Sequence, residues 1–252
     1  MPKGLLYLYY QIYLINVQRK MQKRTVSENL SEFMQYLAAQ CRNEANHLPT
    51  LAELSASLGV SVATLREQLE VARALGLVEV RPRTGIKLVP YSFRPAVMKS
   101  LDYALSVHYK YFRDFSDLRN HIEMAYFQQA AVKLQDEDYQ KLRGLVNHAQ
   151  AKLKGDPIQI PHYEHRELHL TIYRRLDNPF VLGLLESYWD VYEAVGLDVY
   201  TDITYLERVW YYHQQIVEAI CSGDIATGYQ ALVEHMELLV QRSKPVSYQK
   251  FE

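Results

Sequence analysis

The sequence contains little cysteine and little glycine. Its 252 residues include two cysteines, Cys41 and Cys221, and 10 glycines. Two isolated cysteines exclude a disulfide-rich scaffold, and they lack the spacing of a zinc ribbon or a redox CxxC motif. This usage fits the reducing cytoplasm, where we expect the protein to reside. The scarcity of glycine favours long helices over many tight hairpins.

Motifs typical of nucleotide-binding proteins and of hydrolases are also missing. The chain has no Walker sequence, no glycine-rich dinucleotide fingerprint and no GxSxG. It contains no internal repeat and no low-complexity tract. The sequence therefore gives no reason to expect an enzyme of these classes.

A long apolar run occurs only near the start of the chain. Gly4 to Val17 is apolar over 14 residues, which is too short to cross a bilayer core of roughly 30 Å. The following QRKMQKR lacks the small residues of a signal-peptide cleavage site. We expect no membrane attachment. Residues 1–24 are treated as an extension that either precedes a start at Met21 or packs on the body.

Charge is distributed unevenly along the chain. Residues 1–99 hold 13 Lys/Arg and 7 Asp/Glu, whereas the remainder holds 15 and 22. A basic first part and an acidic second part suggest two modules with different partners. The basic module is a candidate for binding a polyanion.

The basic part has the pattern of a winged helix-turn-helix. An amphipathic helix over 25–45, with Ser27 as a plausible N-cap, precedes a short helix that Thr50 and Glu53 can start with a capping box. Gly59 ends that helix, and a second helix is predicted over 61–74, closed by Gly76. LVEV, RPRTG and IKLV then predict two short strands joined by a turn.

The position of the polar and basic side chains in this module points to DNA. Arg66 lies in the N-terminal part of the second helix, where a recognition helix meets base edges. A basic hairpin tip can approach phosphates and the minor groove. The candidate DNA-binding residues are Thr50, Ser61, Thr64, Arg66, Arg81, Arg83, Thr84 and Gly85. The alternative is a winged helix that binds another protein.

From Arg94 onward the chain is predicted to be helical. Apolar residues recur at i, i+3, i+4 and i+7, and breaks are expected at Arg113-Asp114, Asp136 and Gly155-Asp156-Pro157. The prediction is an all-α bundle of six or seven helices. We therefore expect a mainly α protein with three segments: the extension 1–24, a winged-helix domain 25–92 and a helical effector-binding and dimerisation domain 95–245.

The segment HYEHRELHL carries three of the nine histidines. His165 and His169 are four residues apart, so a helix places both on one face. They are candidate metal ligands, although each histidine taken alone is more often structural or exposed. Glu167 lies about 200° around the helix from His165 and cannot act as the base of a zincin-type metalloenzyme.

Four phrases in order resemble the GntR family of bacterial regulators, in the FadR subgroup with its C-terminal ligand-binding (FCD) domain. They are LGVSVATLREQL with GLVEVRPRTG, DLRNHIE, HRELHLTIYRRLDNPFV, and YHQQIVEAICSGDIATGYQALVEHM. The resemblance covers about residues 25–242. The sequence departs from the family at Val62, where Arg is usual, at Thr64, where Pro is frequent, and at His165, where Asp is frequent.

The resemblance implies both ligands and partners. It maps His169, His213 and His235 onto metal-binding histidines, with His165 in the place of the Asp, and Arg119 onto an arginine suited to a carboxylate effector. The alternative for Arg119 is an ion pair on its own helix with Glu123, four residues on. Four imidazoles favour Zn²⁺ or Ni²⁺ over Mg²⁺ or Ca²⁺. It also implies a homodimeric repressor that binds a palindromic double-stranded DNA operator. The alternatives are a helical-bundle metalloenzyme and a metal-free regulator with a different effector.

Overall fold

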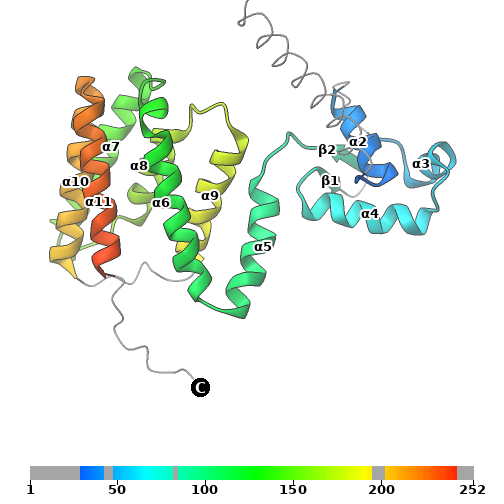
Figure 1. The fold of residues 1–252 in the computed structure, drawn as a ribbon, viewed down its shortest axis with the longest axis horizontal. Helices are drawn as coiled ribbons and strands as arrows, with labels where there is room; N and C mark the ends of the chain where they lie inside the picture. The colour runs from blue at the N-terminus through cyan, green and yellow to red at the C-terminus, as the bar shows by residue number, and fades with distance from the viewer. Residues whose placement is uncertain (1–28, 43–47, 82–84, 195–201, 243–252) are drawn as a thin grey trace, which may run out of the picture. The chain divides into compact units, whose positions relative to one another are not determined.

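The computed structural model describes residues 29–42, 48–81, 85–194 and 202–242. The chain divides into two compact units, Met1–Tyr91 and Ser92–Glu252 (Figure 1). Each unit has its own apolar core, and each is described separately.

The first unit consists of three helices and a two-stranded sheet. In chain order these are α2 (Glu32–Arg42), α3 (Leu51–Leu58), α4 (Val62–Ala74), β1 (Val78–Arg81) and β2 (Gly85–Leu88). The strands are antiparallel, with Val78 opposite Leu88. One core holds the unit together, formed by Phe33, Leu37, Leu54, Leu65, Leu69, Ala72, Val78 and Ile86. This is the predicted winged helix-turn-helix.

The helix ends of this unit follow the predicted capping signals. Thr50 and Glu53 form a reciprocal capping box at the start of α3, and the Ser61 side chain accepts from the Thr64 amide at the start of α4. Gly59 and Gly76 have φ of 67° and 69°, a left-handed conformation that glycine adopts without a steric penalty. The two glycines therefore end α3 and α4 and set the turn between the helices. Ser27 lies outside the described residues.

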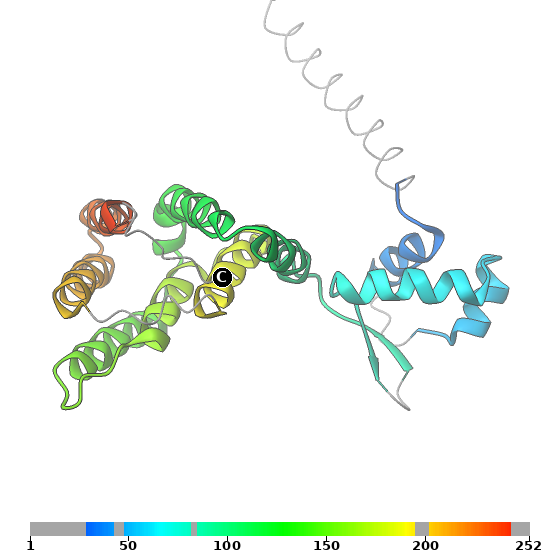
Figure 2. The same cartoon turned by 90° about the horizontal axis from the view of Figure 1, so that it is seen from below.

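The second unit is a helical bundle. Its helices are α5 (Arg94–Val107), α6 (Lys110–Ala131), α7 (Asp136–Leu153), α8 (His162–Tyr173), α9 (Pro179–Ala194), α10 (Ile203–Ser222) and α11 (Ile225–Arg242). Five of them close a ring in the order α6, α8, α7, α10 and α11, and α9 packs on α6 and α8 with α5 beside it. Figure 2 shows α10 next to α11 and α5 next to α9 when the helices are viewed along their length. The mainly α fold is confirmed.

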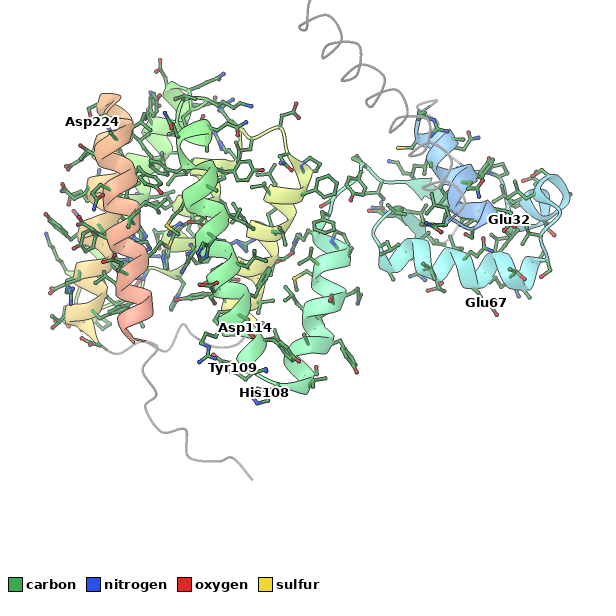
Figure 3. The ribbon with its side chains drawn as sticks, in the orientation of Figure 1. Glu32, Glu67, His108, Tyr109, Asp114 and Asp224 are labelled. Carbon is green, nitrogen blue, oxygen red and sulfur yellow. The ribbon has the colours of Figure 1, made fainter. Side chains whose placement is uncertain are left out.

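Two predicted helix boundaries are wrong. The helix expected over 25–45 begins instead at Glu32, and residues 29–31 before it are not helical. The break expected at Arg113-Asp114 lies inside α6, and the chain turns instead at His108 and Tyr109 (Figure 3). Arg113 and Asp114 are exposed, and charged residues on the solvent face are compatible with a helix. His108 is extended, with φ −160° and ψ 125°. Because the sequence has no Gly or Pro there, no strong signal marked the true turn.

An ion cluster joins the start of α7 to the end of α8. Asp138 is fully buried, accepts from the Gln135 amide at 3.0 Å, and contacts the guanidinium groups of Arg174 and Arg175. Burial alone would raise the pKa of Asp138. The hydrogen bonds from Arg175 and the Gln135 amide, with the charge of Arg174, outweigh burial and lower this pKa below its ordinary 3.8.

Because the pKa of Asp138 is lowered in the folded protein, its ionised form stabilises the fold above about pH 4. That contribution is lost as pH falls from about 4 through the lower folded pKa. Asp138→Asn is expected to destabilise the protein by about 1–3 kcal/mol at pH 7, and by progressively less in acid. Thermal unfolding across this pH range measures the difference. Asp136→Asn, an exposed neighbour on the same helix, is the control; an equal effect of the two substitutions contradicts the assignment.

Within the residues that the structure places, no helix is long and apolar enough to cross a membrane.

Candidate metal centre

Four histidines from three helices meet inside the helical ring. His165 and His169 lie on α8, His213 on α10 and His235 on α11. One ring nitrogen from each can be chosen so that all four atoms lie within 4.8 Å of one another. His169, His213 and His235 are buried, and His165 is half-buried at the edge of the group. The structure thus brings together the four residues singled out from the sequence.

The geometry of the cluster is tight around His213. Its Nε2 lies 3.1 Å from Nε2 of His169. Its ring centroid is 4.3 Å from that of His235 and 4.8 Å from that of His165. Two nitrogens bound to one zinc ion at about 2.0–2.1 Å lie at most about 4.2 Å apart. Small side-chain rotations therefore suffice to place all four on one ion.

The chemistry of the cluster suits a transition-metal ion. Burial, assisted by the charge of Arg119, holds the pKa of each histidine well below 6.5, and for His165, His213 and His235 the neighbouring histidines add to this shift. The rings are therefore neutral at pH 7, which is the form that binds metal. Nε2 of His165, Nδ1 of His213 and both ring nitrogens of His235 are buried without a hydrogen-bond partner. Such atoms are rare in folded proteins unless a ligand satisfies them.

A buried carboxylate and a buried guanidinium group lie beside the histidines. Glu123 and Arg119, both on α6, form an ion pair with Oε1 and Nε 2.8 Å apart. The other carboxylate oxygen of Glu123 is 2.8 Å from Nδ1 of His169. Burial raises the pKa of Glu123, and the charge of Arg119 opposes that shift. Arg119 thus has the intrahelical partner that was the alternative to effector binding, but the pair is buried rather than solvated.

Aromatic rings surround the polar group. Trp189 is 1% exposed, and its ring centroid lies 4.7 Å from that of His165 and 5.1 Å from that of His169. The Arg119 guanidinium stacks over Tyr188 and Trp189, with 4.7 and 5.1 Å to the ring centroids. Trp210 packs on His213, with 4.8 Å between the two ring centroids. Both tryptophans are buried core residues, and they separate the histidines from water.

Two residues near the cluster do not join it. His162, at the first position of α8, is half-buried and outside the group. Glu167 pairs with Lys141 of α7, with Oε2 and Nζ 2.6 Å apart. Glu167 is thus engaged outside the histidine group, as its position on the helix predicts.

The second role of Glu123 was not predicted from the sequence. Its spacing from Arg119 indicated only an ion pair on the same helix, whereas the carboxylate also contacts His169 on α8. The residues are 46 positions apart in the chain, so local spacing carried no signal. The only hint was an acidic residue on the apolar face of α6, in DLRNHIE.

The candidate DNA-binding residues lie on exposed parts of the first unit. Thr64 and Arg66 are exposed in the first half of α4. Thr50 and Ser61 are exposed, and their hydroxyls cap α3 and α4. Arg81 ends β1 and pairs with Glu79 at 2.7 Å, and Gly85 starts β2 with φ 74°. Arg83 and Thr84 lie outside the described residues.

A helix-turn-helix unit is a DNA-binding motif, and in this chain it is followed by a helical bundle with a buried polar centre. Residues 114–238 match the family model of the FCD domain. The bundle therefore belongs to the FCD domain family, and the predicted resemblance to GntR-family transcriptional regulators with this domain is confirmed. The chain is thus placed among regulators rather than enzymes.

Individual relatives agree with this placement. The chain is 23% identical over 222 residues to the uncharacterized HTH-type transcriptional regulator YcbG of Bacillus subtilis, covering 86% of this chain and 89% of that protein. Its fold is similar to the solved structure of Streptococcus agalactiae GntR, with a TM-score of 0.63 and 21% identity, over 84% of this chain and 98% of that one.

Proposed function

We propose that this regulator is a dimeric repressor whose operator affinity is controlled by a divalent metal ion and a small organic acid bound in the helical bundle. The observation that carries the proposal is the group of four converging histidines, three of them fully buried and several of their nitrogens unpaired. A purely structural cluster would leave those nitrogens unsatisfied at a cost of about 1–3 kcal/mol each.

The metal would be held by His165, His169, His213 and His235. All-nitrogen ligation favours Zn²⁺ or Ni²⁺ over the oxygen-seeking Mg²⁺ and Ca²⁺. A bound ion supplies a positive charge that attracts a carboxylate. Trp189 and Trp210 shield this charge from water, which strengthens the attraction.

The effector carboxylate would be oriented by Arg119. This side chain is 2% exposed, and its Nη2 has no hydrogen-bond partner. Its Nε faces Glu123 at ion-pair distance but without hydrogen-bond alignment. A planar guanidinium with N–H groups to spare can bond both oxygens of a carboxylate. A small organic acid therefore fits the combined charge of the ion and Arg119.

A polar connection leads from the histidines to the start of the bundle. Arg166, which follows His165, donates from Nη2 to Asp190 of α9 at 3.2 Å. The other oxygen of Asp190 accepts from Nε of Arg94 at 2.6 Å, and Arg94 is the first residue of α5. The winged helix ends shortly before this residue in the chain. A change at the histidines can thus alter how α5 is held, and through linkage alter operator binding.

On the DNA side, α4 would enter the major groove of each half-site, with Arg66 and Thr64 toward the bases. The wing, with Arg81, Arg83 and Gly85, would contact the backbone and minor groove. A homodimer on a palindrome doubles these contacts. Strong salt dependence is the signature of such phosphate contacts.

The test is DNA binding by the purified protein, using fragments that it selects from a random pool. Arg66→Ala is expected to weaken binding by roughly tenfold or more, since a base-contacting arginine contributes about 1–3 kcal/mol. Gel-shift titration at fixed salt measures this effect. Arg73→Ala is the control, because Arg73 lies in the last turn of the same helix and pairs with Glu70.

Equal binding by wild type and the Arg66 variant would remove α4 from the interface. If no fragment is selected at all, the winged helix binds a protein instead. If selected DNA binds but the protein takes up neither Zn²⁺ nor Ni²⁺, the chain is a metal-free regulator.

A further inference from the structure

Glu123 has a partner on each of its carboxylate oxygens and on its backbone. Oε2 is 2.8 Å from Nδ1 of His169, and Oε1 is 2.8 Å from Nε of Arg119. The Tyr173 hydroxyl donates to the Glu123 carbonyl at 2.9 Å. Glu123 and Tyr173 are fully buried. Two partners therefore hold the carboxylate, and a third holds the main chain of the same residue.

The contact with His169 determines which ring nitrogen is free. An ionised carboxylate only accepts hydrogen bonds, so Nδ1 of His169 carries the hydrogen. Its Nε2 then presents a lone pair, and this is the atom that faces Nε2 of His213 at 3.1 Å. The geometry thus presets His169 in the tautomer and ring orientation that a metal ion requires.

The charge of Glu123 matters because the four rings are neutral. Among the residues that the structure describes, the one carboxylate in contact with these histidines is that of Glu123. Glu164, also buried on α8, is paired instead with Nζ of Lys152 at 2.7 Å. A divalent ion on four imidazoles would lack a negative ligand. Glu123 supplies a negative charge one ring away, through His169.

We propose that Glu123 is the positioning residue of the metal centre, orienting His169 and partly balancing the charge of the ion. The inference rests on the proposed function, since it concerns how the same site binds metal. Arg119 holds the carboxylate in place from its other side. Carboxylates that orient metal-binding histidines in this way typically contribute 10–100-fold to metal affinity.

The test is Zn²⁺ binding by Glu123→Gln, measured by competition with a chromophoric chelator. Glutamine keeps the size and an acceptor oxygen but removes the charge. We expect the Zn²⁺ dissociation constant to rise by about 10–100-fold. Glu164→Gln is the matched control, with the same chemical change at a buried carboxylate that contacts no histidine. It is expected to bind Zn²⁺ as the wild type does.

A spectroscopic readout separates positioning from a general loss of structure. The visible absorption of bound Co²⁺ reports its ligand geometry, and we expect it to change in Glu123→Gln but not in Glu164→Gln. Wild-type affinity and spectrum in a folded Glu123→Gln protein would overturn the inference while leaving the metal site intact. Absence of Zn²⁺ and Co²⁺ binding by the wild type would overturn the metal part of the proposed function as well.

If Glu123→Gln does not fold, the tautomer of His169 in the wild-type protein still tests the inference. Nitrogen NMR of histidine-labelled, metal-free protein distinguishes the two imidazole tautomers. Hydrogen on Nδ1 of His169 is the expected result, and hydrogen on Nε2 would overturn the inference.

Discussion

Replacing His213 with alanine is expected to abolish metal uptake. The wild type, purified without a tag, should carry or take up about one Zn²⁺ or Ni²⁺ per chain. His213 is central to the cluster. Its Nε2 lies 3.1 Å from Nε2 of His169, and its ring packs against those of His165 and His235. Removing this central ligand leaves three of the four, a set that we expect to lose the ion during purification. Elemental mass spectrometry of both proteins measures the loss.

A second readout follows from linkage between binding and folding. An ion that binds only the folded protein stabilises it by about 2.7 kcal/mol when present at 100 times its dissociation constant. Excess Zn²⁺ should therefore raise the melting temperature of the wild type and leave that of His213→Ala unchanged. His148→Ala, at an exposed position of α7, is the control and should behave as the wild type does. Full metal content in His213→Ala would show that the cluster is not the binding site.

Much of the fold was predictable because its signals are local. Thr50, Glu53, Gly59 and Gly76 each act within a few residues of themselves, and the structure has the caps and turns that they predict. The helical bundle followed from periodicity in the same way. The turn at His108 was missed because it depends on how α5 and α6 pack, and nearby residues give no sign of it.

The histidine cluster shows the corresponding limit for predicting a site from sequence. The spacing of His165 and His169 was visible on one helix, but His213 and His235 came only from the family resemblance. No spacing rule connects residues on α8, α10 and α11 before the ring of helices is known. The contacts of Glu123 were harder still to predict from the sequence, because its two carboxylate oxygens have partners on different helices. Residues that complete a site through packing require the structure.

A large loss of stability is expected when Gly183, where α9 meets the start of α5, is replaced with alanine. A Cβ at this position would lie 2.7 Å from the main-chain nitrogen of Arg94 and 2.9 Å from Cβ of Phe93. Main-chain atoms cannot move away as a flexible side chain can. Gly183→Ala should therefore displace the first turn of α5 and destabilise the protein by about 1–3 kcal/mol. Gly144→Ala is the matched control, since a Cβ on that α7 glycine meets nothing within 4 Å.

The same substitution tests whether α5 transmits the signal. The histidines are untouched, so Gly183→Ala should bind Zn²⁺ as tightly as Gly144→Ala does. Its DNA binding, however, should no longer respond to Zn²⁺, because the contact of Arg94 with Asp190 depends on the close approach at Gly183. Gel shifts with and without Zn²⁺ measure this response in both variants. An undiminished response in Gly183→Ala would mean that the signal reaches the winged helix by a route other than the start of α5.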